Sequence, residues 1–265
     1  MTKEPRPVIL AVSFGTSYED TRSVTIGAIE STLAERNPEW EVRRAFTSNI
    51  IRKKLLERDG IKIDSVSEAL EKLAAEGIKQ VIIMPTHMLE GDEYDKKIVN
   101  AAKDFKGRIA DIRVGRALLT NDMDFRHMAV ILDQITSPLA DEDTARVFMG
   151  HGTEHSANEG YAKLQQTIES KGYKNMFIGT VEAEPTLEDM VKIVKERGYK
   201  KVLLSPLMIV AGDHATNDMA GDDDDSWKST FEKAGCKVTC RVAGLGSDWR
   251  IQRMIAYHCK QAIEG

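Results

Sequence analysis

The chain has 265 residues, of which 42% are hydrophobic and 30% charged, and this length suits one large domain or two domains with complete hydrophobic cores. Its net charge of −5, with lysine and arginine spread along the chain, argues against a nucleic-acid-binding protein. The sequence contains no run of about 18 apolar residues, which argues against a membrane-spanning helix.

The first half alternates apolar runs with segments of helical periodicity. We predict strands at residues 8–12, 40–46, 81–84 and 109–114, because these runs are apolar or alternate in polarity. Residues 23–36, 66–75 and 94–105 predict helices, and Gly77 ends the second of them.

The second half continues the same alternation. Predicted strands lie at residues 147–149, 176–181, 202–210 and 237–242. Predicted helices lie at residues 157–170, 187–197, 227–233 and 248–263. Strands that alternate with helices indicate an α/β protein with parallel sheets that are flanked by helices on both faces.

From Gly77 to Asp92, the first half matches the second half in one register without a gap. The matched residues are Gly77 with Gly198, Pro85 with Pro206, Gly91 with Gly212, and Asp92 with Asp213. Residues 14–16 likewise match residues 151–153. We therefore predict an internal duplication, with an N-terminal α/β domain at 1–136, an acidic linker at 137–144, a C-terminal α/β domain at 145–246 and a closing helix at 247–265.

Chemistry in such a fold is expected beyond the carboxyl ends of the strands. Four segments end there: residues 13–17, 90–93, 150–153 and 212–214. The duplication is expected to place these loops across a cleft, with the repeat equivalents Glu93 and His214 both reaching it. Glu182 and Glu184 follow the next strand of the second half.

Two imidazoles with carboxylates form a suitable ligand set for a borderline divalent ion such as Co²⁺, Fe²⁺, Ni²⁺ or Zn²⁺. His151 lies between Gly150 and Gly152, and glycines there would let a bulky ligand approach the backbone. His87 is interpreted as structural, with a pocket-lining or axial-ligand role as the alternative. The acidic run at 222–225 is interpreted as a solvated loop before a helix, with an ion funnel near His214 as the alternative.

Several other classes of protein lack support. No Walker A motif, no Gly-x-Gly-x-x-Gly after the first strand and no Gly-x-Ser-x-Gly elbow is present, so we expect no nucleotide cofactor. The three cysteines are an odd number near the C-terminal end, which indicates reduced thiols rather than a disulfide framework. The segment before the first strand has no apolar leader, and we expect a cytoplasmic protein.

The combination of motifs resembles the anaerobic cobalamin-pathway cobalt chelatases, which act on sirohydrochlorin and belong with the ferrochelatase-like class II chelatases. The resemblance spans nearly the whole chain. The segments that carry it are Val12-Ser-Phe-Gly-Thr-Ser-Tyr18, Arg44-Ala-Phe-Thr-Ser48, Arg58-Asp-Gly-Ile61, Gly91-Asp-Glu-Tyr94, Phe148-Met-Gly-His-Gly152, Ala211-Gly-Asp-His-Ala-Thr-Asn-Asp-Met219 and Asp224-Asp-Ser-Trp-Lys228.

The resemblance implies two Rossmann-like domains with a tetrapyrrole in the cleft between them, and a C-terminal helix that can pack back on the first domain. It implies that His151, His214 and Glu93 bind the incoming metal, with His151 also near the pyrrole protons. The implied activity is insertion of Co²⁺ into sirohydrochlorin, or into a tetrapyrrole of the precorrin-2 class, with release of two protons during cobalamin biosynthesis.

The chemistry of metal insertion agrees with these residues. The ion must be held by few ligands with one coordination position open, and two pyrrole protons need acceptors. We predict His151 and Glu93 as catalytic residues, and Glu182 and Glu184 as further ligands or proton acceptors.

The substrate-binding residues are predicted from the substrate's carboxylates and apolar ring. Backbone N–H groups of the first strand's loop, with Arg52 or Lys53, would bind carboxylates. The predicted substrate-binding residues are Ser13, Phe14, Gly15, Thr16, Ser17, Met88 and Leu89. Met84 and Ile209 are further candidates for apolar walls, with a place in the core as the alternative.

Three other functions remain open from the sequence. An iron chelatase that forms sirohaem would use the same residue types, and Fe²⁺ or Ni²⁺ are possible substrates. A metal- or tetrapyrrole-binding protein without turnover would share the same fold and ligands. An unrelated α/β enzyme could use His151 as a base. The expected partner is the tetrapyrrole, with a homo-oligomer possible and neither nucleic acid nor membrane expected.

Overall fold

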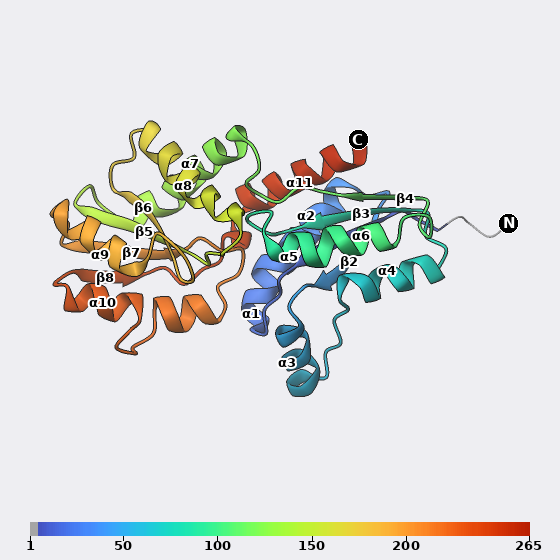
Figure 1. Ribbon diagram of the computed structural model, residues 1–265, viewed down its shortest axis with the longest axis horizontal. Coiled ribbons are helices and arrows are strands. Elements are labelled where there is room, and N and C mark those ends of the chain that lie inside the picture. Colours follow the sequence, from blue (N-terminus) through green and yellow to red (C-terminus); the bar gives the residue numbers. More distant parts are fainter. Residues whose placement is uncertain (1–4) are drawn as a thin grey trace. The chain divides into compact units, whose positions relative to one another are not determined.

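The computed structural model describes residues 5–265. The expectation about an apolar leader falls in part on residues 1–4, which lie outside the described part. The described chain divides into two compact units, drawn in Figure 1. Unit 1 comprises the residues up to Leu118 together with Gly246–Gly265, and unit 2 comprises Leu119–Leu245. Among the described residues, no helix is both long and apolar enough to cross a membrane.

Unit 1 is built on a sheet of four parallel strands in the order β2-β1-β3-β4. The strands are β1 (Val8–Ser13), β2 (Glu41–Phe46), β3 (Gln80–Pro85) and β4 (Asp111–Val114). The central strand β1 is buried along its whole length, because helices cover both faces of the sheet and every residue before Ser13 is apolar.

The helices of unit 1 connect these strands and include several short or π-helical segments. They are α1 (Glu19–Arg22), η1 (Ser23–Gly27), α2 (Ala28–Arg36), α3 (Asn49–Asp59), α4 (Val66–Ala75), α5 (Asp92–Tyr94), η2 (Asp95–Val99), α6 (Asn100–Asp104) and α11 (Trp249–Glu264). Helix α4 begins with a capping box formed by Ser65 and Glu68, and Gly77 follows it with a φ of +74°.

Unit 2 repeats the sheet of unit 1. Its strands are β5 (Thr144–Gly150), β6 (Met176–Thr180), β7 (Lys201–Pro206) and β8 (Lys237–Cys240). They are parallel and lie in the order β6-β5-β7-β8, which matches β2-β1-β3-β4 strand for strand. Pro85 ends β3 as Pro206 ends β7, so the register read from the sequence is that of the structure. The predicted two-domain parallel α/β fold is confirmed.

The helical segments of unit 2 are α7 (Asp122–Thr136), η3 (Ser137–Leu139), η4 (Ser156–Asn158), α8 (Glu159–Ser170), α9 (Leu187–Glu196), η5 (His214–Met219) and α10 (Trp227–Lys233). The remaining segment η6 (Leu245–Ser247) spans the boundary with the last part of unit 1. The predicted strand at 202–210 is shorter in the structure and ends at Pro206.

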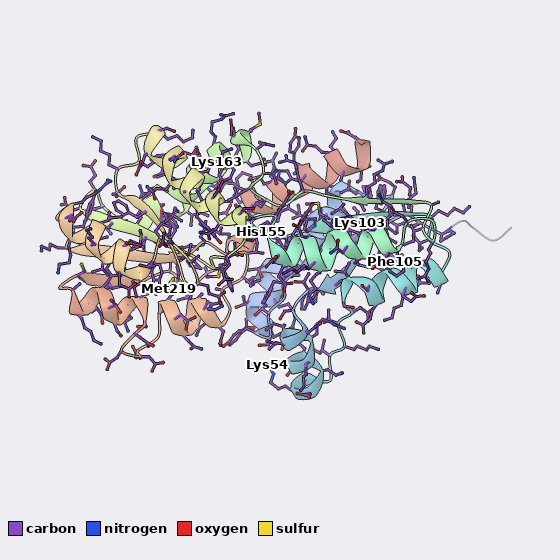
Figure 2. The ribbon with its side chains drawn as sticks, in the orientation of Figure 1. Lys54, Lys103, Phe105, His155, Lys163 and Met219 are labelled. Carbon is purple, nitrogen blue, oxygen red and sulfur yellow. The ribbon has the colours of Figure 1, made fainter. Side chains whose placement is uncertain are left out.

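The boundary between the units differs from the predicted linker at 137–144. The division follows Leu118, and α7 belongs to unit 2, where it packs against α8. Lys163 of α8, labelled in Figure 2, forms an ion pair with Asp122 at the start of α7. At the other end of α7, the guanidinium of Arg146 in β5 donates to Asp133 at 2.7 Å and to the hydroxyl of Thr136 at 3.2 Å. These contacts explain why α7 stays with the second sheet.

The closing helix α11 returns to unit 1, although it is the last element of the chain. It packs against α2, β3 and β4. Its apolar face is buried there, and Arg113 of β4 donates to the carbonyl oxygens of Ala262 and Ile263 near its end. Unit 1 is therefore discontinuous in sequence.

Candidate metal centre

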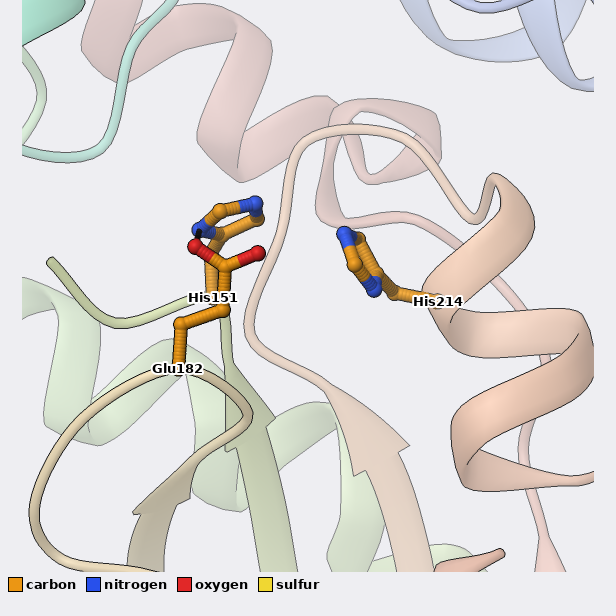
Figure 3. A group of neighbouring side chains, drawn as sticks. All are labelled: His151, Glu182 and His214. Carbon is orange, nitrogen blue, oxygen red and sulfur yellow. Dashed lines mark ion pairs between the residues drawn. The ribbon is translucent and has the colours of Figure 1, made fainter.

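Three side chains gather where three neighbouring strands of unit 2 end. His151 directly follows β5, Glu182 lies in the loop after β6, and His214 begins η5 after β7. Because β6, β5 and β7 are adjacent and parallel, their carboxyl ends meet at one edge of the sheet. Figure 3 shows the three side chains pointing toward one another at this edge.

The geometry of the group suits a metal ion. One ligand atom from each residue lies within 4.8 Å of the others. The ring centroids of His151 and His214 are 4.8 Å apart with an interplanar angle of 89°. The side chains of His151, Glu182 and His214 are 43%, 55% and 35% exposed, so the site is open to an incoming ligand. Two imidazoles and one carboxylate leave at least one coordination position for a substrate.

The loop that carries His151 is fixed by backbone hydrogen bonds. The N–H groups of Val181 and Glu182 donate to the carbonyl oxygen of His151 at 3.2 and 2.8 Å. The buried hydroxyl of Tyr161 accepts from the N–H of Gly152 at 3.4 Å, and burial raises the pKa of this phenol. The loops after β5 and β6 are therefore tied together, which places Glu182 beside His151.

The glycines on either side of His151 are required by the packing of the chain itself. A Cβ on Gly150 would lie 2.4 Å from the ring of Tyr161. Gly152 has a φ of +86°, and a Cβ there would lie 2.8 Å from the backbone nitrogen of Ala183. The structure gives these glycines a packing role, and the room that they would leave for a ligand stays a prediction.

Hydrogen bonds to the two Nδ1 atoms determine which nitrogens face the ion. His151 Nδ1 lies 2.9 Å from the carbonyl oxygen of Gly152, which can only accept, so Nδ1 carries the proton of the neutral ring. His214 Nδ1 lies 2.5 Å from a carboxylate oxygen of Asp218. In this tautomer, Nε2 of each ring carries the lone pair that a metal would bind.

Asp218 is the residue of this site that the sequence reasoning missed. The signal was present, since Asp218 lies four residues after His214 in a segment that forms a helical turn. The match of this segment to the first repeat instead favours Glu93 as the partner of His214, and it does not reveal the local pair of His214 and Asp218.

The predicted ligand Glu184 lies in the same loop as Glu182 but outside the group of ligand atoms. Its carbonyl oxygen accepts from the side-chain amide of Asn158 at 2.8 Å, and Asn158 in turn accepts from the N–H of Thr153 at 3.1 Å. The backbone of Glu184 thus connects the loops after β5 and β6.

The predicted ligand Glu93 belongs to unit 1, where it lies in the first turn of α5 after Gly91. It occupies the position in unit 1 that His214 occupies in unit 2. One carboxylate oxygen of Glu93 is buried and has no hydrogen-bond partner among the described residues. An unpartnered buried carboxylate oxygen is costly, which favours a ligand at this atom. Its role as a metal ligand stays a prediction.

Most residues of the predicted carboxylate-binding loop of unit 1 are buried. Ser13, Thr16 and Ser17 are buried, and the hydroxyl of Ser13 accepts from that of Thr86 at 2.9 Å. Gly15 has a φ of +105° and lies against the ring of Phe46.

The other predicted substrate-binding residues differ in exposure. Phe14 is 44% exposed, Met88 and Leu89 are half-buried, and Met84 is fully buried in the core. Arg52 donates to the carbonyl of Ile63 and pairs with Glu68, whereas the side chain of Lys53 is 74% exposed.

His87 lies in unit 1 at the end of β3. Its Nδ1 atom is buried without a hydrogen-bond partner among the described residues, and Nε2 lies 3.5 Å from the hydroxyl of Thr47. Burial lowers the pKa of His87 to about 4, so the ring is neutral near pH 7.

Comparison with protein families and curated proteins gives matches over almost the whole chain. The family model "Cobalt chelatase (CbiK)" matches residues 7–264. A sirohydrochlorin cobaltochelatase of Salmonella typhimurium is 40% identical over 258 residues, which cover 97% of each chain. The sirohydrochlorin cobaltochelatase CbiKC of Nitratidesulfovibrio vulgaris is 36% identical over 231 residues, covering 86% of this chain and 80% of that protein.

Comparison with solved structures shows the same fold at low sequence identity. SirB from Bacillus subtilis, solved with Fe³⁺, has a TM-score of 0.62 at 11% identity and covers 97% of this chain and 96% of its own. CbiX, described as the terminal enzyme of sirohaem biosynthesis in denitrifying bacteria, has a TM-score of 0.59 at 18% identity and covers 97% of this chain and 99% of its own.

Proposed function

Since the chain belongs to the cobalt chelatase (CbiK) family, we propose that it inserts Co²⁺ into sirohydrochlorin with release of two protons, as a step in cobalamin biosynthesis. In class it is a metal-ion chelatase, and Co²⁺ is its metal substrate rather than a resident cofactor. The observation that supports assigning this activity to particular residues is the group of His151, Glu182 and His214 beyond the ends of three parallel strands.

We propose that these three residues hold the incoming Co²⁺. The two Nε2 atoms and one carboxylate oxygen are ligands suited to a borderline divalent ion. Few protein ligands and a partly exposed site allow the ion to exchange its remaining ligands for ring nitrogens of the substrate. A site that completed the coordination shell with protein atoms would retain the ion instead of delivering it.

Proton removal is the second requirement of the reaction. Two pyrrole N–H bonds break as two metal–nitrogen bonds form, and both protons must reach acceptors. We propose His151 as one acceptor, because its Nε2 lone pair becomes free when the metal leaves. Glu182 is proposed as the other on the basis of its position beside His151. Glu93 stays a predicted ligand or acceptor in unit 1.

The test is the absorbance change of sirohydrochlorin with Co²⁺ and a trace of protein. We expect many product equivalents per protein molecule, and loss of turnover in His151→Ala. His127→Ala is the matched control, because His127 is an exposed histidine of α7 that takes no part in the metal group.

The same assay decides between the remaining alternatives. Parallel rates with Fe²⁺ and Ni²⁺ measure the metal preference, which the residue types leave open. One product equivalent per protein molecule would indicate a binding protein without turnover. No acceleration over the protein-free mixture with any of the three metals would refute the chelatase proposal.

A further inference from the structure

The hydrogen bond between His214 and Asp218 differs in kind from the one made by His151. His214 Nδ1 and a carboxylate oxygen of Asp218 are 2.5 Å apart, whereas His151 Nδ1 lies 2.9 Å from a neutral carbonyl and farther, at 3.5 Å, from a carboxylate oxygen of Glu182. Hydrogen bonds with an ionised partner are shorter and stronger than those between neutral groups. The two imidazoles of the metal group therefore have unequal support.

The segment η5, which contains His214 and Asp218, is held in place by buried side chains and by hydrogen bonds at its start. Ala215 and Met219 of η5 are fully buried, and Met219 belongs to the core of unit 2. The hydroxyl of Thr216 donates to the carbonyl of Gly212 at 3.0 Å, and the amide of Asn217 donates to Asp213 at 3.0 Å. With the backbone of this turn anchored, the carboxylate of Asp218 has a defined position relative to the His214 ring.

From these contacts we infer that Asp218 is a positioning residue for the reaction. It holds Nδ1–H of His214, directs Nε2 toward His151 and Glu182, and makes Nε2 a stronger donor to the metal. The inference rests on the proposed metal site. Carboxylates in this position fix the tautomer and orientation of metal-binding histidines and raise their basicity.

An unequal pair of imidazoles has a consequence for metal transfer. His214, whose Nδ1 has a close carboxylate partner, binds the ion more tightly, and His151, whose close partner is a carbonyl, releases it first. Asp218 thus makes His214 the residue that retains the metal until insertion. A direct ligand role for Asp218 is the competing view, although Asp218 lies outside the group of ligand atoms in the described chain.

The test compares Asp218→Ala and Asp218→Asn with the unchanged protein. Co²⁺ affinity is measured from the visible ligand-field absorption of the protein-bound ion without tetrapyrrole, and turnover is measured with it. Loss of such an outer partner typically weakens metal binding by about 10–100-fold. We expect this loss in Asp218→Ala, with a raised KM for Co²⁺ and an unchanged KM for sirohydrochlorin. Asp218→Asn, whose amide oxygen still accepts from Nδ1–H, should restore most of the affinity.

A double mutant separates positioning from a direct role. In a His214→Ala background, Asp218→Ala should cause no further loss of Co²⁺ affinity. An equal loss in both backgrounds would overturn the inference, because Asp218 would then act independently of His214. Asp223→Ala is the matched control for charge, since Asp223 is an exposed acid a few residues away.

Failure of this inference can be distinguished from failure of the proposed function. Normal Co²⁺ affinity and turnover in Asp218→Ala, with an active unchanged protein, would refute the positioning role alone. Reduced Co²⁺ affinity in Asp218→Ala, with an unchanged protein that binds Co²⁺ but never converts sirohydrochlorin, would support the positioning role and refute the chelatase proposal.

Discussion

The imidazole of His214 meets that of His151 edge to face, with ring centroids 4.8 Å apart and planes at 89°. Each ring has its Nδ1 within hydrogen-bond distance of an acceptor of the protein, which leaves Nε2 of each ring for the proposed metal. The two residues follow adjacent strands, His151 directly after β5 and His214 after the segment 207–213 that follows β7.

Replacement of His214 and replacement of His151 are expected to impair Co²⁺ binding and turnover to different extents. His214→Ala should weaken Co²⁺ binding by more than the roughly 10–100-fold typical of an outer-shell loss, because it removes a ligand itself. His151→Ala should also lose turnover, by at least about 100-fold, through loss of a proton acceptor. Co²⁺ titration and turnover at saturating Co²⁺ measure these effects separately. Full recovery of His151→Ala by excess Co²⁺ would contradict its role with the protons.

Glu182 and Glu184 offer a matched pair in one loop. Glu182→Gln removes the negative charge beside His151 and should weaken Co²⁺ binding by about 10-fold or more. Glu184→Gln should leave it unchanged, because Glu184 contributes a backbone carbonyl to the contact with Asn158 and lies outside the group of ligand atoms. Co²⁺ titration of both variants measures the difference, and equal losses would show that Glu184 reaches the ion.

Gly152 and Gly172 allow backbone strain to be separated from steric clash. Both have a positive φ, +86° and +84°, but a Cβ on Gly172 would have nothing within 4 Å. Gly172→Ala should cost only the strain, about 1–2 kcal/mol. Gly152→Ala should cost more because of its contact with Ala183, and it should also displace His151. Denaturant unfolding of both variants measures the two free energies, and equal values would show that the loop after β6 can yield.

His87 should make the protein less stable as the pH falls below neutrality. Burial lowers the pKa of His87 from 6.5 to about 4, so between these values the unfolded chain binds a proton that the folded chain does not. The stability from the neutral ring is complete above pH 6.5 and falls toward pH 4, by up to about 3 kcal/mol in total.

Urea unfolding at a series of pH values measures this effect. His87→Gln should flatten the dependence between pH 6.5 and 4, whereas His127→Gln, at an exposed position, should not. If His87→Gln kept the full slope, another group would account for the acid sensitivity.

The sequence was sufficient to predict the duplicated fold, because the pattern behind it is local and strong. Buried parallel strands are continuous apolar runs, and Pro85 and Pro206 mark the same position in both repeats. The placement of His151 and His214 followed from the rule that parallel strands present ligands at their carboxyl ends.

The features that escaped prediction depend on contacts between segments far apart in the chain. Helix α3 was missed because it is mostly charged and buries only Leu55. The assignment of α7 to unit 2 depends on Arg146, whose guanidinium reaches Asp133 and Thr136 from another strand. The sequence favoured Glu93 over Glu182 as a metal ligand, because the repeat pattern reveals equivalent positions in the two halves. It does not show which neighbouring loops are joined by hydrogen bonds.

Helix α11 gives the two units a different order of completion on the ribosome. All strands and helices of unit 2 lie between Leu119 and Leu245, so they emerge from the exit tunnel before Trp249–Glu264. The apolar surfaces of α2 and β3 that α11 covers stay open to solvent or to a chaperone during that interval. Unit 1, although most of it is encoded first, therefore cannot complete its packing until the whole of unit 2 has been synthesised.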